Sequence, residues 1–123
     1  QAQLDRWEIV TSLNYLSLEK EMEIILAKNK NLNNAKGKEK VSNMIKVASL
    51  TRRGFIAGDI STVMSPRTVL NWVSNSEIFS DHGYAFRVTF LNKCDEAEKS
   101  IISEYYQRCF GEDLPESSIN IKI

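Results

Sequence analysis

The sequence predicts a mainly α-helical protein, a bundle of helices preceded by one short strand. Ser17 and the pair Ser65–Pro66 are strong helix-start signals, because serine caps a helix and proline suits its first position. Gly58 and Gly111 follow segments with helical apolar periodicity, as helix-ending glycines do. Trp7 to Leu13 is instead rich in β-branched and aromatic residues that alternate with polar ones. A lone strand leaves its backbone groups unpaired, so either this strand is unpaired or its sheet lies in sequence outside this chain.

The composition is that of one soluble globular domain. The chain has 123 residues, of which 42% are hydrophobic and 26% charged. Sixteen basic residues balance 16 acidic ones, so no net charge favours nucleic acid or an anionic membrane as a partner. No apolar run could span a membrane and no signal peptide opens the chain, so we expect a cytoplasmic location. The chain starts with Gln inside a structured segment, which indicates a trimmed terminus or a fragment of a longer protein.

The first half of the bundle contains two predicted helices. The first begins after Ser17 and presents four apolar residues on one face: Leu18, Met22, Ile25 and Leu26. Residues 29–37 are polar and rich in asparagine, which predicts a loop. The second helix ends near Gly58, and its predicted buried residues are Val41, Met44, Ile45, Ala48 and Phe55.

The second half contains a third helix, a short helical segment and a last helix. The third helix starts at Ser65 and Pro66, and its buried stripe is Val69, Leu70, Trp72 and Val73. The short segment runs from a turn near Asp81 to Leu91, and the last helix spans Asp95 to Phe110 with Ala97, Ile101, Ile102, Tyr105 and Cys109 inward. Cys94 and Cys109 are expected to be reduced thiols. Residues 1–16 would be the remnant of another domain, residues 17–117 the helical domain, and residues 118–123 an edge strand or a frayed tail.

Arg67 is the strongest candidate for a binding residue. It occupies the second position of its helix, where the positive end of the helix dipole disfavours a cation by about 0.3–1 kcal/mol. Three N–H groups and a guanidinium that converge at a helix start would bind an anion such as phosphate. The alternative is that Arg67 extends into solvent or pairs with a carboxylate such as Asp59.

The remaining charged and polar residues give weaker signals. Arg6 precedes the predicted strand, where its side chain would project from a sheet edge or remain solvated. Arg52 and Arg53 are expected on a solvated helix face. His82 is the only histidine and has no cysteine at ligand spacing, so we predict no metal site. No glycine-rich phosphate loop is present in the sequence.

Several stretches resemble a known family. Residues 1–7, Gln-Ala-Gln-Leu-Asp-Arg-Trp, are similar to the segment that closes the core of MoxR-type AAA+ ATPases, and Ser65-Pro66-Arg67 resembles their sensor-2 signature. Residues 58–69, 90–96, 104–111 and 114–117 resemble, more specifically, the small ATPase subunit of aerobic cobaltochelatases. The resemblance implies a helical AAA+ lid domain preceded by the last strand of the α/β ATPase core.

The resemblance also implies an activity, partners and residue roles. The family couples ATP hydrolysis, with Mg²⁺, to insertion of Co(II) into hydrogenobyrinic acid a,c-diamide in cobalamin synthesis. Its ATPase subunits form rings, commonly hexamers, and work with a second AAA+-like subunit and a large corrin-binding subunit. By position, Arg67 with Ser65 and Pro66 would reach the γ-phosphate of ATP, and Arg6 would act on the nucleotide of a neighbouring subunit. The family's Walker A and Walker B motifs are missing from this sequence, so the chain alone should neither bind ATP nor hydrolyse it.

Two alternatives remain open at this stage. A MoxR-type ATPase that remodels a different metalloprotein would have the same lid. A freestanding helical interaction module would need Arg67 to be paired internally and the Trp7 strand to find a partner within the chain.

Overall fold

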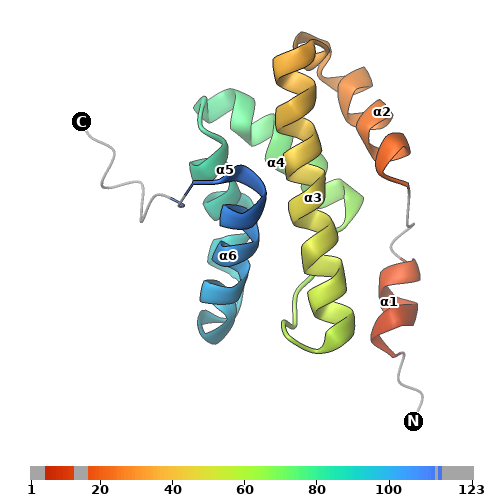
Figure 1. The fold of residues 1–123 in the computed structure, drawn as a ribbon, viewed down its shortest axis with the longest axis vertical. Coiled ribbons are helices and arrows are strands. Elements are labelled where there is room, and N and C mark those ends of the chain that lie inside the picture. Colours follow the sequence, from red (N-terminus) through yellow and green to blue (C-terminus); the bar gives the residue numbers. More distant parts are fainter. Residues whose placement is uncertain (1–4, 13–16, 113, 115–123) are drawn as a thin grey trace.

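The computed structural model describes residues 5–12, 17–112 and 114, and it is a bundle of α-helices (Figure 1). The helices are α1 (Arg6–Ser12), α2 (Leu18–Lys28), α3 (Ala35–Ala57), α4 (Pro66–Phe79), α5 (His82–Thr89) and α6 (Lys99–Phe110). Short 3₁₀ turns are η1 (Lys30–Leu32), η2 (Leu91–Lys93) and η3 (Glu96–Glu98). The prediction of a mainly α fold is confirmed.

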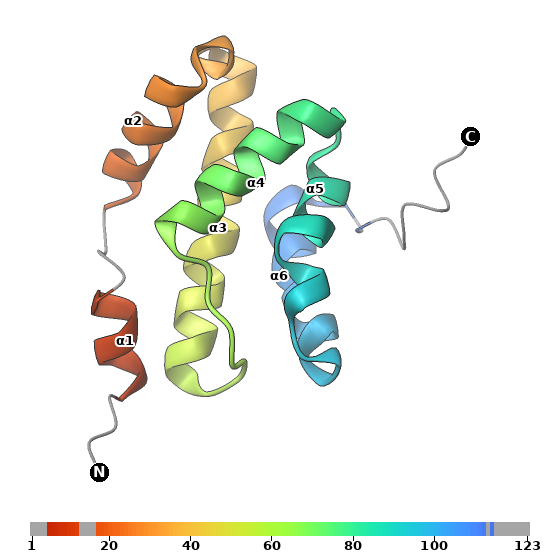
Figure 2. The ribbon, with the colours of Figure 1, turned by 180° about the vertical axis from the view of Figure 1, so that it is seen from behind.

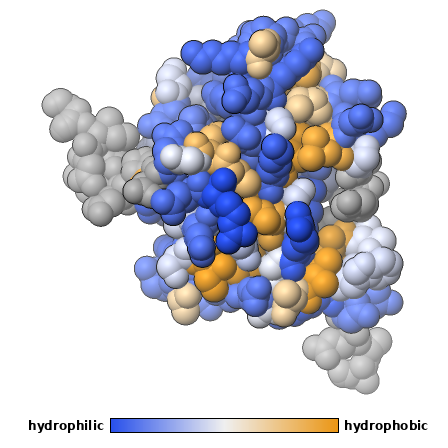
Figure 3. All heavy atoms as spheres, in the orientation of Figure 1, coloured by the Kyte–Doolittle hydropathy of each residue, from blue (hydrophilic) through white to orange (hydrophobic). Residues whose placement is uncertain are grey.

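The long helix α3 is the centre of the bundle. Helices α1 and α2 pack along one side of it and α6 along the other (Figure 1). Seen from behind, α4 crosses α3 and leads into α5, against which it packs extensively (Figure 2). The face of Figure 1 carries small apolar patches separated by hydrophilic side chains (Figure 3). Among the described residues, no helix is long and apolar enough to cross a membrane.

The predicted strand at Trp7 to Leu13 is wrong, because Arg6–Ser12 forms helix α1 and Leu13 lies outside the described residues. A capping box explains the helix. The Asp5 side chain accepts the Glu8 N–H at 2.8 Å, and the Glu8 carboxylate accepts the Asp5 N–H at 3.2 Å. Val10 is the buried residue of the helix, while Trp7 remains 62% exposed. The remnant of a core sheet predicted here is therefore not a strand.

Helices α2 and α3 follow the predicted pattern with two differences. The Ser17 side chain caps α2 as expected, and Gly58 ends α3 at a left-handed φ of 87°. All five residues predicted to be buried in α3 are buried. The predicted loop at residues 29–37 extends too far, because Asn34 caps α3 through the Gly37 N–H at 2.8 Å. In α2, Leu18 is largely exposed and the acidic Glu21 is buried instead.

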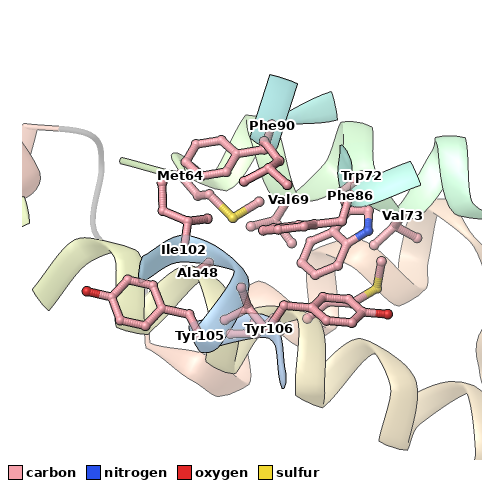
Figure 4. Close-up of a cluster of buried hydrophobic side chains, with 14 of the residues drawn as sticks. Ala48, Met64, Val69, Trp72, Val73, Phe86, Phe90, Ile102, Tyr105 and Tyr106 are labelled. Carbon is pink, nitrogen blue, oxygen red and sulfur yellow. The ribbon is translucent and has the colours of Figure 1, made fainter. Parts of the chain in front are cut away.

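The core gathers where α3, α4, α5 and α6 meet (Figure 4). Trp72 of α4 lies 4.8 Å from the Phe86 ring and 6.4 Å from the Tyr106 ring, between ring centroids. Its indole N–H donates to the His82 carbonyl at 2.9 Å, so the buried polar group has a partner. Val69, Trp72 and Val73 are buried as predicted.

The last helix differs from prediction at its start. Helix α6 begins at Lys99 after η3 rather than at Asp95, and both Cys94 and Cys109 are free thiols as expected. Ala97 is exposed rather than inward, and Tyr106 takes an additional core position. Gly111 ends the helix at a φ of 72°, as predicted. The tail, residues 118–123, lies outside the described residues.

Candidate functional site

The start of α4 has the cap that the sequence predicts. Ser65 adopts an extended conformation and its hydroxyl accepts the Thr68 N–H at 3.2 Å. The same hydroxyl lies 3.1 Å from the Thr68 hydroxyl, and Pro66 occupies the first helical position. These contacts fix the direction in which the helix leaves the preceding segment.

The backbone of this helix start is a poorer anion site than expected. Three N–H groups were predicted to converge there, but Pro66 has none, and the Ser65 side chain already accepts the Thr68 N–H. The Val69 N–H bonds to the Ser65 carbonyl at 3.1 Å as the first helical hydrogen bond. Within the described part of the chain, only the Arg67 N–H of this turn is left without an acceptor. An anion would therefore be held mainly by the Arg67 side chain.

Arg67 itself is exposed at the start of α4. Among the described residues it makes no hydrogen bond or ion pair, so the alternative pair with Asp59 is not formed, whereas the other alternative, extension into solvent, matches its exposed position. The positive end of the helix dipole lies beside the Arg67 guanidinium, and no carboxylate among the described residues pairs with it. Its positive charge is therefore not compensated by the described residues. Such a guanidinium can accept a ligand with two or more anionic oxygens without first breaking a contact.

Side chains of α3 hold the segment that leads to Arg67. The Met64 N–H donates to the Thr51 hydroxyl at 3.1 Å, and the Met64 carbonyl accepts from Arg52 Nε at 2.9 Å. Both backbone polar groups of Met64 are thus satisfied from one turn of α3. The Met64 side chain is fully buried in the core (Figure 4). The N–H, the carbonyl and the side chain of Met64, the residue immediately before the Ser65 cap, are consequently all held in place.

Arg52 was expected on a solvated helix face, and that prediction is wrong. Its guanidinium donates to both oxygens of Glu21 on α2, at 3.0 and 2.9 Å. The two side chains are 7% and 3% exposed, so the ion pair is buried. Arg53, its neighbour, is exposed as expected. The sequence offered one signal that was missed, an acidic residue at a position of α2 that faces the core.

Arg6 holds the other end of the same segment. One guanidinium nitrogen, Nη1, donates to the Phe55 carbonyl at 3.0 Å and to the Ile60 carbonyl at 2.9 Å. Its carbon Cζ lies 4.7 Å from the centre of the Phe55 ring, a cation–π arrangement. Arg6 therefore satisfies carbonyls where α3 ends and attaches α1 there.

Arg6 and Arg67 thus border one connecting segment, residues 58–65, from opposite ends. The structure shows no direct contact between them. Glu98 of η3 adds a third support, because its carboxylate accepts the Ser61 N–H at 2.9 Å and the Ser61 hydroxyl at 3.0 Å. Helices α1 and α3 and turn η3 therefore all help to set the path of the chain into α4.

Other features lie away from Arg67. The described residues contain no group of three histidine, cysteine or acidic side chains that could hold a metal ion. His82 stacks on Phe110, with ring centroids 4.5 Å apart, and its Nε2 lies 3.1 Å from a Glu112 oxygen. A hollow of about 410 Å³ lies between α1 and α3 and is lined by Trp7, Val10, Thr11, Ser49, Arg52, Arg53 and Ile56.

Comparison with known proteins confirms the predicted resemblance. Over 121 residues, or 98% of this chain, the sequence is 59% identical to the aerobic cobaltochelatase subunit CobS of a Sinorhizobium species. The chain spans about a third of that relative's length, 36%. No protein-family model matches the chain. No solved structure matches it either.

Proposed function

We propose that this chain is the helical lid of an AAA+ ATPase subunit that powers an aerobic cobaltochelatase, and that Arg67 contacts the γ-phosphate of ATP. The observation that carries the proposal is the identity of 59% to a cobaltochelatase subunit across nearly the whole chain. The exposed, uncompensated Arg67 at a rigidly supported helix start agrees with it.

The chemistry asked of Arg67 is electrostatic. Phosphoryl transfer spreads negative charge over the oxygens of the transferred group, and a preorganised guanidinium stabilises that charge. Arg67 is not paired with a carboxylate among the described residues, so it can bind a phosphate without first breaking an ion pair. Because the side chain extends from the first turn of α4, a movement of the lid would move the charge toward the nucleotide or away from it.

ATP and Mg²⁺ would be held mainly by parts of the longer protein. When bound there, Mg²⁺ would supply positive charge that offsets the charge developing on the phosphate. The described residues supply no carboxylate cluster for the ion, and Arg67 is the group here that fits a phosphate. The Ser65 hydroxyl and Pro66 act on this site indirectly, by fixing the start of α4.

The proposed client reaction is insertion of Co(II) into hydrogenobyrinic acid a,c-diamide. The subunit would work as a homo-oligomeric ring, a hexamer, with a second AAA+-like subunit and a large corrin-binding subunit. Arg6 is proposed to serve the nucleotide of the neighbouring subunit. That role requires it to release the Phe55 and Ile60 carbonyls to which it is bonded in this structure.

The alternative of a freestanding interaction module has one of its two requirements met in part, because the Trp7 segment packs within the chain, as helix α1 against α3. That alternative needs Arg67 to be paired internally, and no such pair forms among the described residues. A MoxR-type ATPase with another metalloprotein client would share the lid and its arginine. A cobalt-insertion assay with corrin substrate and the partner subunits separates the two clients, since only the cobaltochelatase gives a cobalt corrin.

The test of the proposed function is ATP hydrolysis by the full-length subunit with Arg67→Ala. We expect a loss of at least about tenfold in the rate, roughly 1.4 kcal/mol of transition-state stabilisation, with the fold retained by circular dichroism. Arg53→Ala is the matched control, because it removes another exposed arginine from the neighbouring helix. If the rate of hydrolysis is unchanged in Arg67→Ala, the proposed contact of Arg67 with the γ-phosphate is wrong.

A further inference from the structure

The buried ion pair of Glu21 and Arg52 does more than join α2 to α3. Arg52 uses its two terminal nitrogens for the Glu21 carboxylate and its Nε for the Met64 carbonyl. One guanidinium therefore links α2, α3 and the backbone that leads into α4. The fork geometry of arginine makes these three bonds mutually dependent, because its nitrogens lie in one rigid plane.

Met64 is separated from Arg67 by only the Ser65 cap and Pro66. Two residues of α3 bind its backbone: the Met64 carbonyl accepts a hydrogen bond from Arg52 Nε, and the Met64 N–H donates one to the Thr51 hydroxyl. Proline has a fixed φ, and a capped helix start has little freedom. A change in the orientation of the Met64 peptide would therefore be passed to the first turn of α4 and to the Arg67 side chain.

We infer that the Glu21–Arg52 pair is a positioning device for Arg67, which sets the direction of the α4 start according to where α2 lies against α3. The inference rests on the proposed function, because it assigns the pair a role in phosphate contact as well as in stability. Arg52 and Glu21 are positioning residues in this scheme, and Arg67 is the group that touches the nucleotide.

Arg52→Lys in the full-length subunit tests this inference. Lysine retains the charge beside Glu21, but it lacks the fork that reaches both carboxylate oxygens and the Met64 carbonyl together. We expect the kcat of ATP hydrolysis to fall about fivefold to tenfold, because a small misplacement of a charged group is costly, while KM for ATP changes less.

The deciding measurement is the same substitution in an Arg67→Ala background. If Arg52 acts through Arg67, Arg52→Lys should lower the rate less than twofold once Arg67 is gone, so the two effects are not additive. A stability role alone would give the same loss in both backgrounds. Equal losses in both backgrounds, or no loss in either, would overturn the inference.

Thr51 provides a second pair of variants in case Arg52→Lys does not fold. Thr51→Val retains the volume but removes the acceptor of the Met64 N–H, whereas Thr51→Ser retains the hydroxyl. We expect Thr51→Val to behave like Arg52→Lys in both backgrounds and Thr51→Ser to hydrolyse ATP at the wild-type rate. Equal rates for the two Thr51 variants would contradict the positioning role.

The outcomes also separate this inference from the proposed function. If Arg67→Ala lowers hydrolysis while the Arg52 effect is additive, only the positioning role is lost. If Arg67→Ala has no effect, the sensor role is lost and the positioning role with it.

Glu77→Gln is the matched control on α4 itself, because Glu77 holds Asn31 and Lys40 far from the start of the helix. It should leave the rate within about twofold.

Discussion

Arg52 of α3 and Glu21 of α2 form a two-pronged ion pair, with N–O distances of 3.0 and 2.9 Å, inside a bundle whose other core residues are almost all apolar. Burial of two charges is costly, and each of the three guanidinium nitrogens of Arg52 donates a hydrogen bond within the protein. Its energetic signature should therefore be that of a buried pair rather than of a surface salt bridge.

Removal of one partner should destabilise the bundle strongly. Arg52→Met leaves Glu21 as an uncompensated buried charge, and we expect the free energy of unfolding to fall by about 3–5 kcal/mol in urea titrations. The double variant Glu21→Leu with Arg52→Met should recover a large part of that loss, because no charge then remains buried. Lys20→Ala, which breaks an exposed pair with Glu23 at 3.9 Å, is the control and should change stability by less than about 0.5 kcal/mol. A similar small effect for Arg52→Met would contradict a buried pair.

The close approach of α3 and α6 at Gly54 makes a second prediction. A Cβ at this position would lie 2.2 Å from the Tyr105 hydroxyl oxygen, so Gly54→Ala forces the tyrosine to move. We expect a loss of about 1–3 kcal/mol in unfolding free energy, despite the higher helix propensity of alanine.

Tyr105→Phe provides the test of that cause. It removes the atom that the new methyl group would meet, so the cost of Gly54→Ala should be markedly smaller in the Tyr105→Phe background than in the wild type. If Gly54→Ala lowers the free energy of unfolding equally in the wild type and in Tyr105→Phe, the clash is not with the Tyr105 hydroxyl.

The helix ends that are marked by a serine cap or a terminating glycine could be predicted from sequence, because they depend on local chemistry. Ser17 and Ser65 cap their helices with their own hydroxyls, and Gly58 and Gly111 adopt the left-handed conformation that ends a helix. The same holds for the buried face of α3, because an amphipathic helix has its core residues at a fixed period.

Three features could not be predicted in this way. The β-branched residues of a short segment predicted a strand at helix α1, whereas the local feature that the structure uses is the Asp5–Glu8 capping box. The role of Arg52 depends on Met64 and Glu21, which are 12 and 31 residues away, and no local pattern reports such distant partners. The anion site was overestimated because Pro66 has no N–H and the Ser65 cap already accepts the Thr68 N–H.

The attachment of α1 to the bundle should depend on Arg6. Arg6→Ala removes two hydrogen bonds from a charged donor and the contact with the Phe55 ring. Because hydrogen bonds of charged groups contribute about 1.5–3 kcal/mol, amide exchange in residues 6–12 should become at least about tenfold faster.

Arg6→Lys is the matched control for this loss. It retains a cation near Phe55 and should give an intermediate exchange rate. Exchange in α3 should change little in either variant, since the core of that helix is formed by other contacts. Unchanged exchange in α1 after Arg6→Ala would show that Val10 and its apolar neighbours hold the helix without Arg6.

The bundle should lose stability in alkaline solution. Burial raises the pKa of the Tyr106 hydroxyl above its ordinary value of 10.0, and the nearby carboxylates of Glu112 and Asp81 raise it further. Burial likewise raises the pKa of the Cys94 thiol above 9.0. Each group binds its proton more tightly in the folded state, so its contribution is complete below the unfolded pKa and is lost as pH rises toward the folded pKa.

Urea titrations between pH 8 and pH 11 would measure this loss. Above about pH 10, each raised tyrosine lowers the free energy of unfolding by up to about 1.4 kcal/mol per pH unit, because the unfolded chain releases the proton first. Tyr106→Phe removes one such group and should make the decline less steep. The same slope in the wild type and in Tyr106→Phe would mean that this hydroxyl ionises as easily in the folded bundle as in the unfolded chain.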